Sequence, residues 1–286
     1  MNQGRCLCGK VRFEVEGPIH HMVNCHCGMC RKHHGSPFVT WAVAPADGYR
    51  VTAGTDAIVR YESTPGTHRS FCRTCGSVLP ELTPSQQHVV VPAGNLEGDL
   101  PDVQLHMFVG SKAPWFTIAD DLPQHEAWPA EYGMQPADWE PPAVADDKET
   151  CGSCLCGDVA YAIDGAPLRF MYCHCSRCRL ARGAAHASNL FYAADGFRWL
   201  RGADEVVDYA LPGARYFAVA FCGRCGSAVP RISAERGVAV VPAGSLDSDP
   251  GMRAQAHIHV TSRAAWERIG ADGIPRFDAL PPAAAG

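Results

Sequence analysis

The chain has 286 residues, 15 of them cysteines, and a formal net charge of −5 at pH 7. This length suffices for two domains, and the acidic balance argues against a general nucleic-acid binder, which needs a basic surface. No apolar run is long enough to span a membrane, and no secretory leader stands out. We therefore expect a cytoplasmic protein without nucleic-acid or membrane partners. In a reducing compartment, an odd and high cysteine count favours metal binding over a disulfide framework.

The predicted elements are mostly short strands. Runs rich in Val, Ile and aromatic residues, separated by Gly and Pro turns, lie at 11–15, 58–61, 88–91, 103–108, 159–163, 206–209 and 238–241. Long amphipathic helices are missing from the pattern, and only segments 30–35 and 178–183 are expected to form short helical turns. The sequence therefore predicts an all-β fold.

Fourteen of the cysteines recur at a nearly fixed offset. The offset is 148 residues for the first five pairs and 150 for the last two, which are Cys6/Cys154, Cys8/Cys156, Cys25/Cys173, Cys27/Cys175, Cys30/Cys178, Cys72/Cys222 and Cys75/Cys225. A period of this length is a whole domain, because solenoid repeats are much shorter. We predict one domain at 1–130, an irregular, proline-rich linker at 131–150 and a second domain at 151–286.

Each half contains a Cys-x-Cys, a Cys-His-Cys-x-x-Cys and a Cys-x-x-Cys group, and such soft sulfur ligands suit Zn²⁺. Seven thiolates fill one closed site of four and leave a group of three with one open position, as in catalytic zinc sites. The predicted closed sites are Cys6, Cys8, Cys72, Cys75 and Cys154, Cys156, Cys222, Cys225. The predicted open, catalytic sites are Cys25, Cys27, Cys30 and Cys173, Cys175, Cys178. In the alternative, a His or an acidic ligand completes the group of three and all sites are structural.

The remaining cysteine and two pairs of histidines receive weaker predictions. Cys151 aligns with Gln3, so we expect an exposed thiol outside the metal groups. His26 and His174 lie between two thiols and should point away from the metal, either orienting a loop by hydrogen bonding or handling protons. His106 and His257 fall in strand-like runs and are expected to be core or hydrogen-bonded residues. No role is assigned to His33 or His34, since neither recurs in the second half.

Three arginines are candidates for anion contacts. Arg31 and Arg179 follow the last thiol of each group of three, where they pair with a substrate carboxylate, offset thiolate charge or lie solvated. Arg69 lies three residues before Cys72, and for it we favour a solvated position.

The segments around the first-half cysteines resemble the glutathione-dependent formaldehyde-activating enzyme family, which shares its domain with centromere protein V. The motifs are GRCLCGKVRF at 4–13, CHCGMCRK at 25–32, GSPF at 35–38 and FCRTCGS at 71–77. The resemblance implies two tandem zinc-binding β-tent domains of small antiparallel sheets, with two zinc ions per domain. After Cys178 the second half lacks the counterpart of GSPF, so we expect a different substrate pocket there.

The resemblance also implies an activity. It is that of a carbon–sulfur lyase, which forms or cleaves an S-hydroxymethyl adduct from a glutathione-like thiol and a formaldehyde-like aldehyde. Its partners are then a small-molecule thiol and aldehyde. A second hypothesis, from a different class, is a zinc-stabilised, non-catalytic binding module for a protein or a small thiol.

Overall fold

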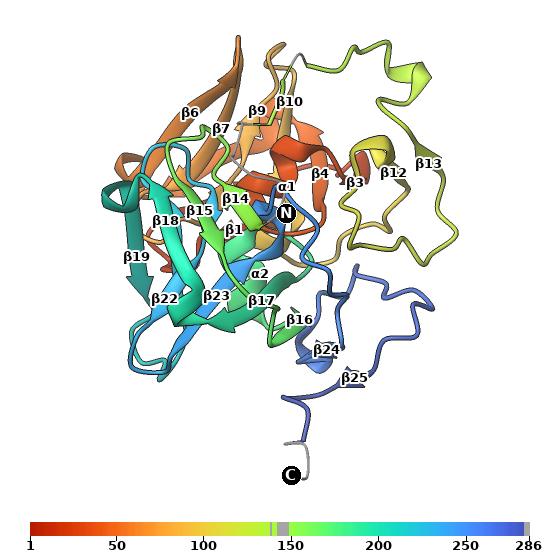
Figure 1. The fold of residues 1–286 in the computed structure, drawn as a ribbon. Helices are drawn as coiled ribbons and strands as arrows, with labels where there is room; N and C mark the ends of the chain where they lie inside the picture. Colours follow the sequence, from red (N-terminus) through yellow and green to blue (C-terminus); the bar gives the residue numbers. More distant parts are fainter. Residues whose placement is uncertain (138, 142–148, 283–286) are drawn as a thin grey trace.

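In a computed structural model of the chain, residues 1–137, 139–141 and 149–282 are described (Figure 1). We call residues 1–130 the first half and residues 149–282 the second half. The strands of the first half are β1 (Asn2–Arg5), β2 (Arg12–Val15), β3 (His21–Cys25), β4 (Val39–Pro45), β5 (Tyr49–Ala53), β6 (Ile58–Thr64), β7 (Thr67–Cys72), β8 (Val78–Leu79), β9 (Glu81–Leu82), β10 (His88–Pro92), β11 (Leu96–Glu97), β12 (Leu105–Met107) and β13 (Gln124–His125).

The second half repeats most of these strands in the same order. They are β14 (Thr150–Ser153), β15 (Ala160–Ile163), β16 (Arg169–Cys173), β17 (Ala187–Ala193), β18 (Phe197–Arg201), β19 (Val206–Ala210), β20 (Ala218–Cys222), β21 (Ala228–Val229), β22 (Arg231–Ser233), β23 (Val238–Pro242), β24 (Ala256–Ile258) and β25 (Arg276–Phe277). The domain boundaries at 130 and 150 stay a prediction. Residues 138 and 142–148 of the predicted linker, and 283–286 of the predicted second domain, lie outside the described residues.

The sheets confirm the predicted all-β fold. Each half has one six-stranded sheet, ordered β13-β12-β3-β4-β10-β9 and β25-β24-β16-β17-β23-β22, with smaller sheets beside it. Most pairings are antiparallel, but β12 pairs in parallel with β3 and β13, and β24 does the same with β16 and β25. The parallel strands carry His106 and His257 alongside the end of the strand that leads into each group of three cysteines.

Two short helices overlap the predicted helical turns and contain the third cysteine of each group of three. They are α1 (Gly28–His34) and α2 (Ser176–Arg182). The Cys27 sulfur caps the start of α1 by accepting the backbone N–H of Cys30, and α1 ends at Gly35, whose φ of 65° favours glycine. Cys175 and Gly183 do the same for α2. Among the described residues, no helix has the length and apolar character needed to cross a membrane.

Each of these helices packs against a turn of the opposite half. The end of α1 contacts the 3-10 turn Ala243–Ser245, and the end of α2 contacts the 3-10 turn Ala93–Asn95. Both turns carry a glycine at the contact. A Cβ atom on Gly94 would meet the backbone of Ala184, and one on Gly244 would meet the backbone of Arg31 and Ser36. The sequence Val-Pro-Ala-Gly, which occurs at 91–94 and again at 241–244, is therefore one of the places where the halves meet.

Each half also contributes a tryptophan to the hydrophobic core of the other half. Trp115, at the end of the first half, is 2% exposed and lies in a hydrophobic cluster otherwise made of second-half residues and Ala113, with its ring 5.4 Å from that of Phe170. Trp266, its counterpart in the repeat, lies with Ala264 in the largest cluster, which is built mainly of first-half residues. Each core therefore depends on a segment from the other half.

A buried ion pair joins the halves beside α1. Lys32 is 4% exposed, and its ammonium lies 2.5 Å from a carboxylate oxygen of Asp247 while also donating to the backbone oxygen and the hydroxyl of Ser153. Figure 1 shows α1 beside β14, which carries Ser153. Because these charges have partners, the buried ammonium fixes the register between the halves.

The prediction that Cys151 is exposed is wrong. Cys151 lies in β14 and is buried, with 6% of its surface exposed. Its backbone N–H donates to the hydroxyl of Ser248, and its carbonyl accepts from Asp247 N–H. Alignment of the two halves pairs Cys151 with Gln3, near the start of the repeat. It does not reveal that the turn after β23 covers β14.

Candidate functional site

Two groups of four cysteines lie at corresponding places in the halves. In each group the four sulfur atoms lie within 4.8 Å of one another, and the groups are Cys6, Cys8, Cys72, Cys75 and Cys154, Cys156, Cys222, Cys225. The first pair of each group follows the first strand of its half, and the second pair closes the turn between β7 and β8 or between β20 and β21. Each group therefore ties the beginning of a half to a later hairpin, as predicted.

The sulfur spacing fits a tetrahedral metal ion. A metal–sulfur bond of about 2.3 Å sets tetrahedral sulfurs about 3.8 Å apart. The Cys6–Cys8 and Cys8–Cys72 sulfur pairs are 3.4 and 3.8 Å apart, and the corresponding second-half pairs repeat both distances. Hydrogen bonding, led by Cys75, lowers the pKa of Cys8 to about 6, while hydrogen bonds to Cys72 and Cys75 and burial raise the pKa of Cys6. Four crowded, partly buried thiolates need a cation to coexist.

Two groups of three cysteines lie where the six-stranded sheets lead into the helices. They are Cys25, Cys27, Cys30 and Cys173, Cys175, Cys178. The first sulfur comes from the end of β3 or β16, the second is the helix cap, and the third lies on the first turn of the helix. Among the described residues, no His, Asp or Glu donor joins either group of three within 4.8 Å. Each group therefore offers three sulfur atoms that could hold one metal ion.

The histidines between the thiols point away from the sulfurs, as predicted. His26 is fully buried, and its Nε2 lies 2.8 Å from Nδ1 of His106, whose Nε2 lies 3.0 Å from a carboxylate oxygen of Asp120. Burial, followed by His106, lowers the pKa of His26 to about 3, so its ring is neutral at pH 7. This chain of hydrogen bonds holds the loop that presents Cys25 and Cys27, which agrees with the orienting interpretation.

The second half has the same series of hydrogen bonds with one further residue. His174 Nε2 lies 2.8 Å from His257 Nδ1, and His257 Nε2 lies 2.7 Å from Asp272. In addition, His174 Nδ1 lies 2.9 Å from the buried carboxylate of Glu267. The repeat places Phe116 at the Glu267 position, and Phe116 lies against the His26 ring at 5.9 Å. The two groups of three therefore rest on different supports.

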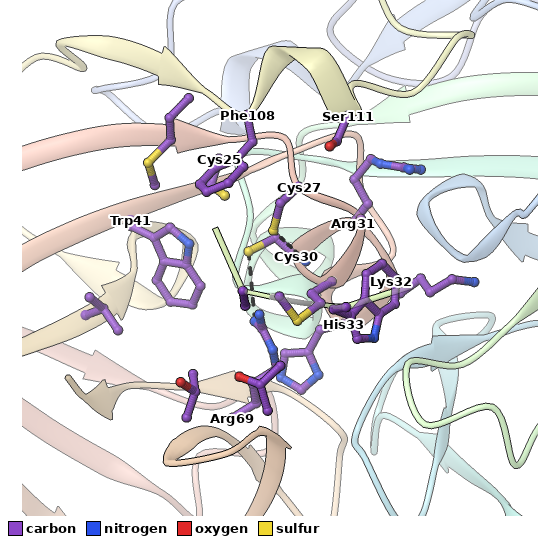
Figure 2. A pocket seen from close by; sticks show the side chains of 18 of the residues that line it. Cys25, Cys27, Cys30, Arg31, Lys32, His33, Trp41, Arg69, Phe108 and Ser111 are labelled. Carbon is purple, nitrogen blue, oxygen red and sulfur yellow. Dashed lines mark hydrogen bonds between the residues drawn. The ribbon is translucent and has the colours of Figure 1, made fainter. Parts of the chain in front are cut away.

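Arg69 is not solvated, contrary to the sequence prediction. It comes from β7, which crosses near α1, and its Nη1 lies 3.9 Å from the Cys30 sulfur (Figure 2). Hydrogen bonds from Cys25 and Cys27, with Arg69 contributing, hold the pKa of Cys30 well below its usual value. Val219 takes the corresponding position in the second half, so only the first group of three has this cation.

A cavity of about 930 Å³ opens beside the first group of three cysteines (Figure 2). Its wall includes all three cysteines, together with Arg31, Arg69 and His33. His33, to which the sequence assigned no role, is 1% exposed, and neither ring nitrogen has a hydrogen-bond partner among the described residues. No role was assigned to His33 from the sequence because the second half has no histidine at the matching position. Positions that differ between the halves are nevertheless the ones where their pockets can differ.

Two comparisons relate this chain to known proteins. The family model described as "Glutathione-dependent formaldehyde-activating enzyme" matches residues 1–111 and again residues 149–262. A crystal structure of a protein from Rhodobacter sphaeroides is 30% identical over a match that covers 35% of this chain and 91% of that chain, with a TM-score of 0.30. The two segments that match the family model contain every cysteine of the four groups and make up most of the sequence. The chain therefore belongs to the glutathione-dependent formaldehyde-activating enzyme family.

Proposed function

We propose that this protein is a zinc-dependent carbon–sulfur lyase that forms or cleaves an S-hydroxymethyl adduct of a glutathione-like thiol and a formaldehyde-like aldehyde. Each half would hold two zinc ions, one in its group of four cysteines and one in its group of three. Many metal-binding thiols require a reducing compartment, which favours the cytoplasm. The single observation that carries the proposal is the first group of three cysteines, which faces a cavity and lies beside Arg69.

The chemistry needs a thiolate, an aldehyde and a place for negative charge. When bound to three sulfurs, zinc would keep one coordination position for substrate and favour the ionised thiol or polarise the carbonyl. The Arg69 guanidinium stabilises negative charge at the sulfur cluster, since it already lies 3.9 Å from Cys30. The substrate thiol releases its proton to water, its sulfur forms the carbon–sulfur bond, the carbonyl π electrons move to oxygen, and that oxygen takes a proton back from water.

The activity is tested by exchange NMR of glutathione with formaldehyde. Wild-type protein should accelerate adduct exchange over buffer alone, and Cys27→Ser should abolish the acceleration because it removes one of three sulfurs. Cys175→Ser makes the same change in the second half, where Arg69 has no counterpart, and should retain most of the rate. Equal exchange rates in buffer, wild type and both variants would show that the protein does not catalyse this reaction.

Arg69 provides a second test. We expect Arg69→Leu to raise the KM for glutathione by roughly tenfold or more, because a charge-assisted contact is lost, whereas Arg69→Lys should keep part of the effect. The measurement is initial adduct formation as a function of glutathione concentration. Val219→Leu, at the matching second-half position, is the control and should leave the KM unchanged. An Arg69→Leu variant with wild-type kinetics would show that Arg69 does not face the substrate.

The second half supports a different candidate role. Its group of three cysteines keeps all the sulfurs but has Val219 in place of Arg69 and Glu267 behind its histidine. We propose that this second group acts as a zinc-stabilised binding or structural module. The same Cys175→Ser variant tests this role, since it should lose zinc while the exchange rate persists.

A further inference from the structure

Three apolar residues in the wall beside the first group of three cysteines have polar counterparts in the second half. In the first half Met29, Trp41 and Phe108 line the cavity beside the cysteines. The repeat places Arg177, Asn189 and His259 at the corresponding second-half positions, so each apolar residue is replaced by a polar one. Phe108 and His259 even share the same left-handed backbone, with φ of 62° and 57°. The comparison therefore concerns side chains on matching backbones.

Further aromatic rings extend the apolar wall beyond the sulfur group. Trp128 lies edge-on to Phe108 with ring centroids 5.1 Å apart, and Trp139 lies so close to the start of α1 that a Cβ atom on Gly28 would meet its ring. The cavity surface is mostly apolar and encloses about 930 Å³. Formaldehyde fills a small part of such a space, and glutathione carries charged or amide groups along its length, so neither explains an aromatic wall.

Two polar side chains of the cavity wall, those of Arg69 and His33, are central to ligand recognition in this inference. Figure 2 shows Arg69 and His33 on one side of the cysteines, with Trp41 and Phe108 on other sides. His33 is buried and its ring nitrogens lack hydrogen-bond partners among the described residues, which is a costly state unless a ligand supplies a partner. A ligand that fits must therefore combine an anionic, hydrogen-bonding part with a bulky apolar part.

Building on the proposed function, we propose that the first half acts on thiol adducts of bulky aromatic aldehydes rather than on formaldehyde alone. The thiol end meets the sulfur group, Arg69 and His33, and the aromatic substituent lies against Met29, Trp41 and Phe108. The atoms balance as in simple addition. The thiolate sulfur forms a bond to the carbonyl carbon, the π electrons move to the oxygen, and that oxygen takes the proton that the thiol released to water.

The test is binding of two stable thioether mimics to the zinc-loaded full chain, measured by calorimetry. S-benzylglutathione carries the aromatic group and S-methylglutathione does not. We expect S-benzylglutathione to bind roughly tenfold tighter or more, because its ring leaves water for an apolar wall. Trp41→Asn, which introduces the second-half residue, and Phe108→His should each remove most of this preference, so that the ratio of the two affinities falls toward one. Asn189→Ala is the matched second-half control and should change neither affinity.

The outcomes separate this inference from the proposed function. Equal affinity for the two thioethers, with formaldehyde exchange still accelerated, would overturn the aromatic preference and leave the proposed function standing. A preference that survives in both Trp41→Asn and Phe108→His would also overturn it, provided that circular dichroism and zinc content show both variants folded. If neither thioether binds and formaldehyde exchange is not accelerated, both proposals are overturned together.

Discussion

Cys72→Ser is expected to unfold the protein at 25 °C. Cys72 is fully buried in the largest hydrophobic cluster and contributes one of the four sulfurs that tie the first strand to the β7–β8 hairpin. Structural zinc in small domains contributes about 10–16 kcal/mol of apparent binding free energy, which exceeds the usual stability of a domain. Cys222→Ser should have the same effect, since it makes the same change in the second half.

The control is Cys151→Ser, which makes the same change from sulfur to oxygen at a buried cysteine that belongs to neither a group of four nor a group of three. It should change the free energy of unfolding by about 1 kcal/mol, as single substitutions commonly do. Urea unfolding followed by circular dichroism gives the comparison. If Cys72→Ser and Cys151→Ser unfold at the same urea concentration, the closed group of four has no structural role.

Trp115→Ala and Trp266→Ala should each lower the free energy of unfolding by ~3–5 kcal/mol, as large-to-small substitutions of buried aromatic residues do. Trp115 is 2% exposed and Trp266 is 6% exposed, and each lies in a core cluster dominated by the other half. Because the exchange is reciprocal, neither core is complete without the opposite half. Both variants should therefore lower the midpoint urea concentration of one unfolding transition that the two halves share.

Urea unfolding monitored separately by fluorescence and circular dichroism tests this expectation. The two signals should change together in the wild type and in both variants. Leu168→Ala, at a side chain that is 56% exposed, is the control and should shift the midpoint little. Two resolved transitions, only one of which responds to each tryptophan variant, would mean that the halves fold independently.

Local features of the fold were predictable from the sequence. The division into four and three follows from ligand number and from the short spacing of Cys25, Cys27 and Cys30, which leaves the two distant pairs to form the group of four. The structure brings those sulfurs together. The strand runs and the two helical turns were also visible, because alternating apolar residues and a glycine stop act over a few positions. The outward direction of His26 likewise follows from the alternation of an extended segment.

The missed features depend on contacts between distant segments. Arg69 reaches Cys30 because β7 crosses near α1, and no local pattern encodes that crossing. Cys151 is buried because the turn after β23 covers β14, and Trp266 enters the first-half core because the chain crosses between the halves. The repeat showed that the halves are alike, yet it carried no sign that they exchange segments.

Zinc content of the purified full chain, measured by elemental analysis against protein concentration, tests the central claim most directly. Each half has one group of four sulfurs and one of three, so the account predicts about four zinc ions per chain. Two or fewer zinc ions per chain, in protein whose fourteen paired cysteines are reduced, would contradict the division into closed and open sites.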